Sequence, residues 1–157
     1  RSLEKLLPLV MKRYIIVLVA AVSLSCARNT INYSDVISEM YSCHDTAQWT
    51  TPELFDALPG TYDWRYVQAW GWGGSYESQS DYLGWTLTLN ADSTYSVDGA
   101  DTVVYEGNWS LENSWYSFTL NLDTSVSTLW GQLVYCPPYL MFYNSPVDGP
   151  DHLYEKR

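Results

Sequence analysis

The sequence has few positively charged residues. It contains 8 lysines and arginines against 18 aspartates and glutamates, and Arg65 is the single cation between Arg28 and Lys156. From Cys26 onward, 4 cations stand against 17 acidic residues, which gives a net charge of −13. A surface of this charge repels phosphate backbones and anionic lipid headgroups. We therefore expect no nucleic acid among the partners of this protein, and no membrane attachment through a basic patch.

The residue types that most often carry catalysis are also scarce. The two histidines are His44 and His152, no metal-ligand spacing joins them, and no lysine lies between Arg13 and Lys156 to serve as a nucleophile. Acidic residues that could cleave a glycoside are present, but strand alternation places Glu106 on a polar face. We therefore expect neither enzymatic activity nor a metal or cofactor.

The apolar run near the start of the chain is short. Lys12 and Arg13 precede it, and it covers 12 residues up to Ser25, whereas a membrane-spanning helix needs about 20. A basic start, a short apolar core and small residues at the end are typical of a secretory signal peptide. We interpret residues 1–25 as upstream residues followed by such a signal.

Cys26 follows this signal directly, and the order resembles that of a bacterial lipoprotein signal. The resemblance implies that Cys26 becomes the first residue and carries a diacylglycerol, usually with an amide-linked acyl chain. Anchoring by more than one acyl chain is stable, whereas a single chain is marginal. Ala27 comes next and no acidic run follows. By the same resemblance this favours the outer membrane, with its periplasmic face favoured over the cell surface.

Lipidation of Cys26 leaves two cysteines, Cys43 and Cys136. In the oxidising compartment of an exported chain they can form a disulfide, which would join the N-terminal segment to a late strand. Two separate buried thiols agree with the sequence equally well. The sequence leaves both arrangements open.

Residues 26–50 are polar and patchy. Val36, Ile37, Met40 and Tyr41 have a weak helical spacing of about two turns. We interpret the segment as a disordered tether that holds the following domain away from the membrane.

A short helix is predicted over residues 51–58, because Thr51 can cap it, Pro52 suits the first helical position and Pro59 ends it. Short alternating runs separated by turns follow. Their links leave no room for a crossover helix, so neighbouring strands should pair antiparallel and either close into a barrel or form two sheets. The runs cover residues 61–70, 85–89, 94–97, 102–110, 116–122, 129–136, 139–143 and 152–156.

The order of several motifs resembles a lipocalin-like (calycin) domain of small bacterial lipoproteins. The short helix leads into a glycine and aromatic residues at 60–64, a glycine and tryptophan recur at 107–109, and residues 140–157 are similar to a closing hairpin. The likeness covers residues 50–157, and the barrel domain that it predicts spans residues 51–157. It implies an all-β fold: a small antiparallel up-and-down β-barrel of about eight strands, with a short N-terminal helix before the first strand.

Most of the tryptophans should fill the interior of such a barrel, Trp109 among them. The exception is the segment that holds Trp70 and Trp72, because glycines flank both rings and favour a mobile loop that presents them. A flexible hairpin with one ring buried agrees equally well. Arg65, opposite Trp64 on its strand, is either paired with a carboxylate or an anchor for an anionic ligand.

We expect an exported, lipid-anchored binding protein. Its ligand would be small, apolar or compatible with aromatic rings, and would bind at the barrel mouth through Trp64, Arg65, Trp70 and Trp72. The first alternative is a protein-interaction module such as a hydrolase inhibitor. The second is a carbohydrate-binding β-sandwich that uses the loop tryptophans. The interior of an eight-stranded barrel either is filled or holds one small ligand, and the sequence leaves this open.

Overall fold

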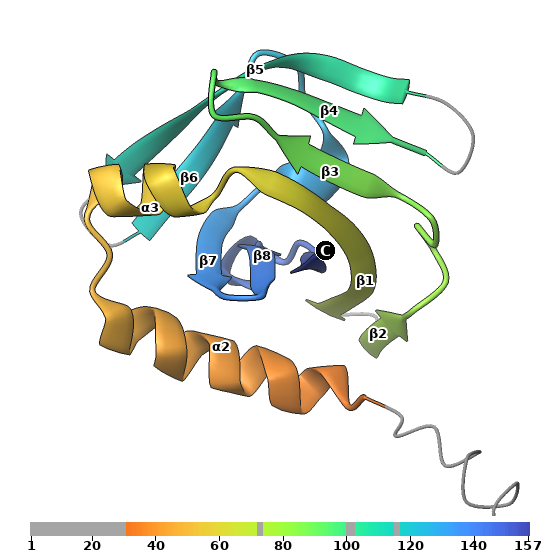
Figure 1. The fold of residues 1–157 in the computed structure, drawn as a ribbon. Helices are drawn as coiled ribbons and strands as arrows, with labels where there is room; N and C mark the ends of the chain where they lie inside the picture. Colours follow the sequence, from red (N-terminus) through yellow and green to blue (C-terminus); the bar gives the residue numbers. More distant parts are fainter. Residues whose placement is uncertain (1–30, 72–73, 100–102, 115–116) are drawn as a thin grey trace, which may run out of the picture. The chain divides into compact units, whose positions relative to one another are not determined.

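Eight antiparallel strands close into a barrel in the computed structural model, which describes residues 31–71, 74–99, 103–114 and 117–157 (Figure 1). Consecutive strands pair, and β1 also pairs with β9, which closes the sheet. The predicted all-β barrel is confirmed, and the two-sheet alternative is wrong. The strands of the barrel are β1 (Gly60–Gly71), β3 (Thr86–Leu89), β4 (Thr94–Asp98), β5 (Val103–Ser114), β6 (Ser117–Leu122), β7 (Gln132–Cys136), β8 (Tyr139–Tyr143) and β9 (Asp151–Lys156).

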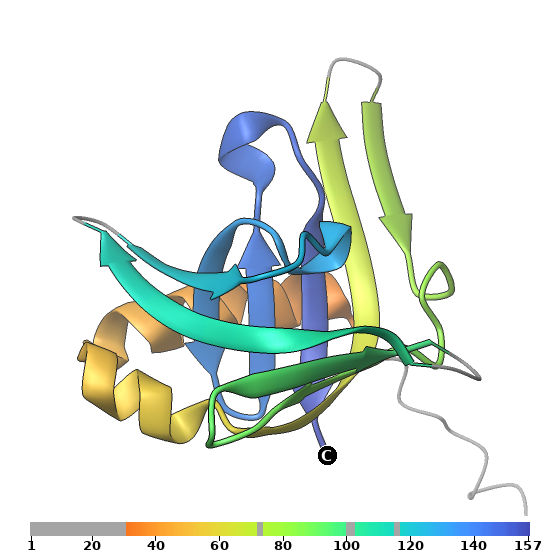
Figure 2. The same ribbon diagram turned by 90° about the horizontal axis from the view of Figure 1, so that it is seen from above.

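Strand β1 continues beyond the barrel and turns back as β2 (Gly74–Ser78). Figure 2 shows this hairpin rising from the end of the barrel at which β8 ends and β9 begins. Trp70 pairs with Ser75 in the hairpin, and Gly71 pairs with Gly74. The described residues of the glycine-flanked segment are therefore paired strand and not the expected loop. Trp72 lies outside the described residues.

Helix α3 (Thr51–Ala57) precedes the first strand, as predicted. Its cap is Thr50, one residue before the expected position, and Thr50 and Glu53 form a reciprocal capping box. Leu54 and Leu58 are fully buried in the main core of the barrel. The helix therefore contributes to the core at the end of the barrel where β1 begins.

Helix α2 (Tyr33–Ala47) corrects the interpretation of residues 26–50 as a tether. Ile37 and Met40 are buried in a second apolar cluster, on the outer face of the sheet. A disulfide joins Cys43 to Cys136, whose Cα atoms are 5.8 Å apart, so that the helix is linked to the end of β7. The members of the cluster from the sheet are Tyr66, Val134, Met141 and Leu153.

Large aromatic side chains occupy the interior of the barrel. Trp109 is buried, as predicted, and its ring stacks on Phe55 of α3 with centroids 4.7 Å apart. Tyr82 lies between β2 and β3 and makes edge contacts with Trp64, Trp85 and His152. The other fully buried aromatic residues of the main core are Tyr62, Tyr95, Tyr154 and Phe142.

Candidate functional site: the groove around Trp130

Trp64, predicted to contact a ligand, is a core residue. Its Nε1 donates a hydrogen bond to Nδ1 of His152 at 3.3 Å, and both side chains are buried. Burial lowers the pKa of His152 to about 4, against the opposing effect of Asp151 and Asp81. Trp64 therefore contacts a neutral imidazole and the packed interior.

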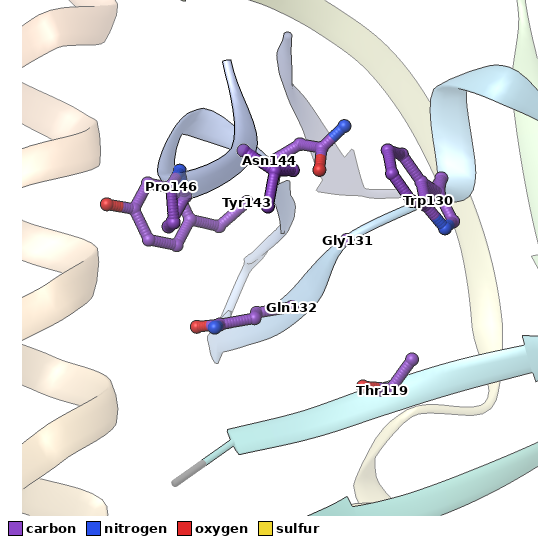
Figure 3. A pocket seen from close by; sticks show the side chains of 8 residues that line it. Thr119, Trp130, Gly131, Gln132, Tyr143, Asn144 and Pro146 are labelled. Carbon is purple, nitrogen blue, oxygen red and sulfur yellow. The ribbon is translucent and has the colours of Figure 1, made fainter. Parts of the chain in front are cut away.

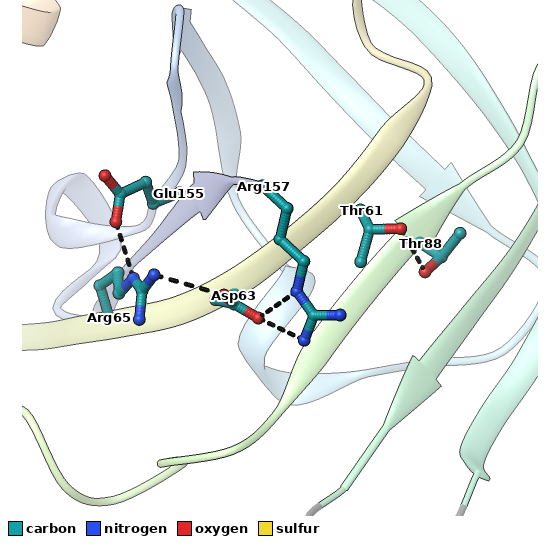
Figure 4. A network of polar contacts seen from close by, with 6 residues as sticks. All are labelled: Thr61, Asp63, Arg65, Thr88, Glu155 and Arg157. Carbon is teal, nitrogen blue, oxygen red and sulfur yellow. Dashed lines mark hydrogen bonds and ion pairs between the residues drawn. The ribbon is translucent and has the colours of Figure 1, made fainter.

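Arg65 lies on the outer face of β1 and is paired with carboxylates (Figure 4). Its Nε donates to Glu155 at 2.8 Å, and its Nη2 lies 3.3 Å from a carboxylate oxygen of Asp63. Arg157 contacts the other oxygen of Asp63 at 2.7 Å. Of the two arrangements expected for Arg65, the structure shows pairing with carboxylates. Its charge is balanced by Asp63 and Glu155.

Trp70 is 53% exposed near the end of the β1–β2 hairpin. Strand alternation places it on the same face as Tyr66, whose side chain lies in the outer cluster under α2. Its predicted role in ligand binding stays a prediction. Cys26, the predicted lipidation site, lies outside the described residues.

Strands β6 and β7 have fewer paired residues than any other two neighbouring strands of the barrel. These strands share two register pairs, Phe118↔Leu133 and Thr119↔Gln132. The chain then leaves β6 and passes through a short 3-10 helix, η2 (Ser127–Leu129), before β7 begins. The segment that connects β6 to β7 therefore lies beside the part of these two strands that is not paired.

Trp130 lies in that connecting segment and is 62% exposed. Gly131 follows it with φ of 123°, a conformation that favours glycine. A Cβ atom on Gly131 would also lie 2.6 Å from the carbonyl oxygen of Tyr143. The glycine therefore lets the chain bend closely against the end of β8, next to the exposed indole.

Two hollows flank Trp130. One, of about 230 Å³, is drawn in Figure 3, and the other, of about 240 Å³, lies between β6 and the η2 segment. Trp130 and Thr119 line both hollows, so together they form one groove, which we call the Trp130 groove. The first hollow is also lined by Gly131, Gln132, Tyr143, Asn144, Pro146 and Val147, and the second by residues 120–122, 124–126 and 129.

Asn144 supplies an amide to this groove. Asn144 is 5% exposed, and its side chain is among those that line the first hollow. Figure 3 shows the amide directed toward the side of the groove on which Trp130 lies. The amide therefore lies in the wall of the groove, where a ligand in the hollow would meet it.

The backbone of Asn144 is held in place by Asp151. The Asp151 carboxylate accepts hydrogen bonds from the backbone N–H groups of Asn144 at 2.7 Å and Ser145 at 2.8 Å. It also accepts one from Gln68 of β1 at 3.1 Å. These bonds fix the backbone at the start of the turn η3 (Ser145–Val147), from which the side chain of Asn144 projects.

Sequence reasoning did not find this site, because it assigned Trp130 to the interior of a strand over residues 129–136. The one available signal was the Trp130–Gly131 pair, the same combination that drew attention to Trp70. Within residues 31–157, apart from the undescribed gaps, no group of three or more His, Cys, Asp or Glu side chains is placed to hold a metal ion. In the same described part, no helix has the length and apolar character needed to cross a bilayer.

Comparisons with known proteins assign no family. No family model matches the chain, and no curated protein sequence matches it. Among solved structures, the chain is similar to a crystal structure of a DUF4847 family protein from Bacteroides vulgatus. The two are 11% identical, the match covers 62% of this chain and 92% of that one, and the TM-score is 0.44.

Proposed function

We propose that this chain is an exported, lipid-anchored binding protein without catalytic activity, and that it binds a small, aromatic-compatible ligand in the Trp130 groove. The observation that carries the proposal is an exposed indole beside a largely buried asparagine, both of which line the same hollow. A ligand that covered this amide without bonding it would leave a polar group unsatisfied, at a cost of about 1–3 kcal/mol, so the groove favours a ligand that bonds it.

The outer groove is a better candidate than the mouth of the barrel. At the end of the barrel where β9 begins, the ring of Tyr82 contacts the rings of Trp64 and His152, with centroids 5.4 Å and 5.5 Å away. A ligand entering there would have to displace packed aromatic rings, whereas the groove around Trp130 already has hollows on both sides.

The disulfide supports the proposed export. A bond between Cys43 and Cys136 persists in an oxidising compartment, outside the cytosol. The proposal that Cys26 carries the lipid anchor rests on the sequence, since that residue lies outside the described part.

Calorimetric titration with palmitate, cholesterol, protoporphyrin and cellotetraose tests the proposed binding site. For any probe that binds, Trp130→Ala should weaken the affinity at least about tenfold, or ~1.4 kcal/mol, because the exposed indole is lost. Trp70→Ala, which removes an indole of similar exposure, separates the two candidate sites. A loss with Trp70→Ala and none with Trp130→Ala would mean that the hairpin binds and the groove does not.

A further inference from the structure

We infer that the ligand of the Trp130 groove is a neutral oligosaccharide. One sugar ring would lie against the indole of Trp130, and its hydroxyl groups would bond the amide of Asn144. This inference rests on the proposed function, because it names the ligand class of the same groove.

The charge of the groove argues against ionic ligands. Within the described residues, both hollows are lined by uncharged side chains alone. The three cations from residue 31 onward are engaged elsewhere: Arg65 with Glu155, Arg157 with Asp63, and Lys156 with a backbone carbonyl. An anionic ligand would find no counter-charge and would meet a protein of net charge −10, and a cationic one would find no carboxylate in the lining.

The amide of Asn144 argues against a purely apolar ligand. An amide offers two donors and one acceptor oxygen, and an apolar molecule over it would remove the remaining water contact without replacing it. A hydroxyl group both donates and accepts, so a polyol can satisfy either end of the amide. Thr119 and Gln132 add further uncharged hydrogen-bonding groups along the same groove.

The indole of Trp130 favours a ring over a flexible polyol. A sugar ring carries hydroxyl groups on its rim and C–H groups on its faces, and the electron-rich face of an indole attracts such C–H groups. This arrangement complements a tryptophan that has amide and hydroxyl side chains beside it, as in Figure 3.

The size and arrangement of the two hollows favour a chain of sugar units. Each hollow, at about 230 and 240 Å³, is smaller than the ~300–1,000 Å³ of sites that enclose a drug-sized molecule. Because Trp130 and Thr119 line both, successive units of one oligosaccharide can occupy the two hollows with the indole between them.

The test is calorimetric titration of the full chain with five neutral tetrasaccharides: cellotetraose, maltotetraose, mannotetraose, xylotetraose and chitotetraose. Tetragalacturonate is the anionic probe, palmitate the apolar probe, and the uncharged peptide acetyl-(Thr-Val)₃-amide the peptide probe. We expect at least one neutral sugar to bind and the three other probes not to bind. Trp130→Ala and Asn144→Ala should each weaken sugar binding at least about tenfold.

Two further variants control for folding. Leu83→Ala removes a side chain that is 68% exposed and lines neither hollow, and should leave the affinity unchanged. Should Asn144→Ala fail to fold, Thr119→Val removes a hydroxyl from the groove at nearly constant shape and should weaken sugar binding.

The outcomes separate this inference from the proposed function. If palmitate or the peptide binds, no neutral sugar does, and Trp130→Ala abolishes that binding, the groove is a binding site and the sugar inference is wrong. Sugar binding that Trp130→Ala leaves intact would contradict the groove itself. Binding of none of the probes counts against both.

Discussion

His152 is 3% exposed, and its Nδ1 accepts a hydrogen bond from the indole of Trp64. A proton on that nitrogen would face an N–H donor and a packed aromatic interior. Burial accordingly lowers the pKa of His152 to about 4, whereas a histidine in the unfolded chain titrates near 6.5. The folded protein therefore holds this imidazole neutral where the unfolded chain would protonate it.

Stability should consequently fall as the pH drops from about 6.5 toward 4. In that window the unfolded state takes up a proton that the folded state does not, and the full shift corresponds to about 3 kcal/mol. Urea unfolding of the wild type and of His152→Gln at pH 7 and pH 5 measures it. The wild type should lose more stability than the variant between the two values; equal losses would mean that His152 is not held neutral by the fold. Because carboxylates and His44 are common to both proteins, the difference isolates this side chain.

At the scale of elements, helix α2 shows that a local sequence pattern does not identify the distant surface on which a helix packs. The spacing of Val36, Ile37 and Met40 was a weak helical signal by itself, and the surface that completes it lies about 100 residues later. Residues 133–135 and 140–142 are buried at every position, so these strands are covered on both faces. Their continuous apolar runs were the available sign that a helix must cover the outer face, but nothing local identifies which segment does so.

The disulfide should contribute to the stability of this helix–sheet contact. Cys43 and Cys136 are separated by 93 residues, and closing a loop of that length restricts the unfolded chain. The double variant Cys43→Ser with Cys136→Ser should lose about 2–4 kcal/mol of unfolding free energy, a typical value for a native disulfide. Hydrogen exchange should show the largest loss of protection in α2. An unchanged unfolding free energy, or a loss of protection spread evenly over the barrel, would mean that the bond does not hold the helix.

At the scale of the whole molecule, the strand order was predictable and the candidate site was not. Alternation and short turns suffice for a meander, since neighbouring strands pair with one another. The groove instead depends on where β6 stops pairing with β7, and on a turn that Asp151 fixes around Asn144. The first is set by the register of two consecutive strands and the second by a hydrogen bond between residues seven positions apart, and neither leaves a periodic pattern in the sequence. Trp130 has a glycine neighbour as Trp70 and Trp72 do, but its exposure follows from its position beside the unpaired part of β6 and β7.

The attachment of the whole molecule to a membrane should depend on one atom, the sulfur of Cys26. From this residue onward the chain carries 4 cations against 17 acidic residues, so electrostatics would oppose binding to an anionic bilayer. We expect the wild type to fractionate with membranes and Cys26→Ser to move to the soluble fraction of the cell envelope. The double variant at Cys43 and Cys136 is the matched control, because it also exchanges thiols for hydroxyls but should stay with membranes. Membrane fractionation of Cys26→Ser at the wild-type level would contradict the lipoprotein proposal. If the variant does move to the soluble fraction, protease treatment of intact cells distinguishes a periplasmic from a surface position of the anchored wild type.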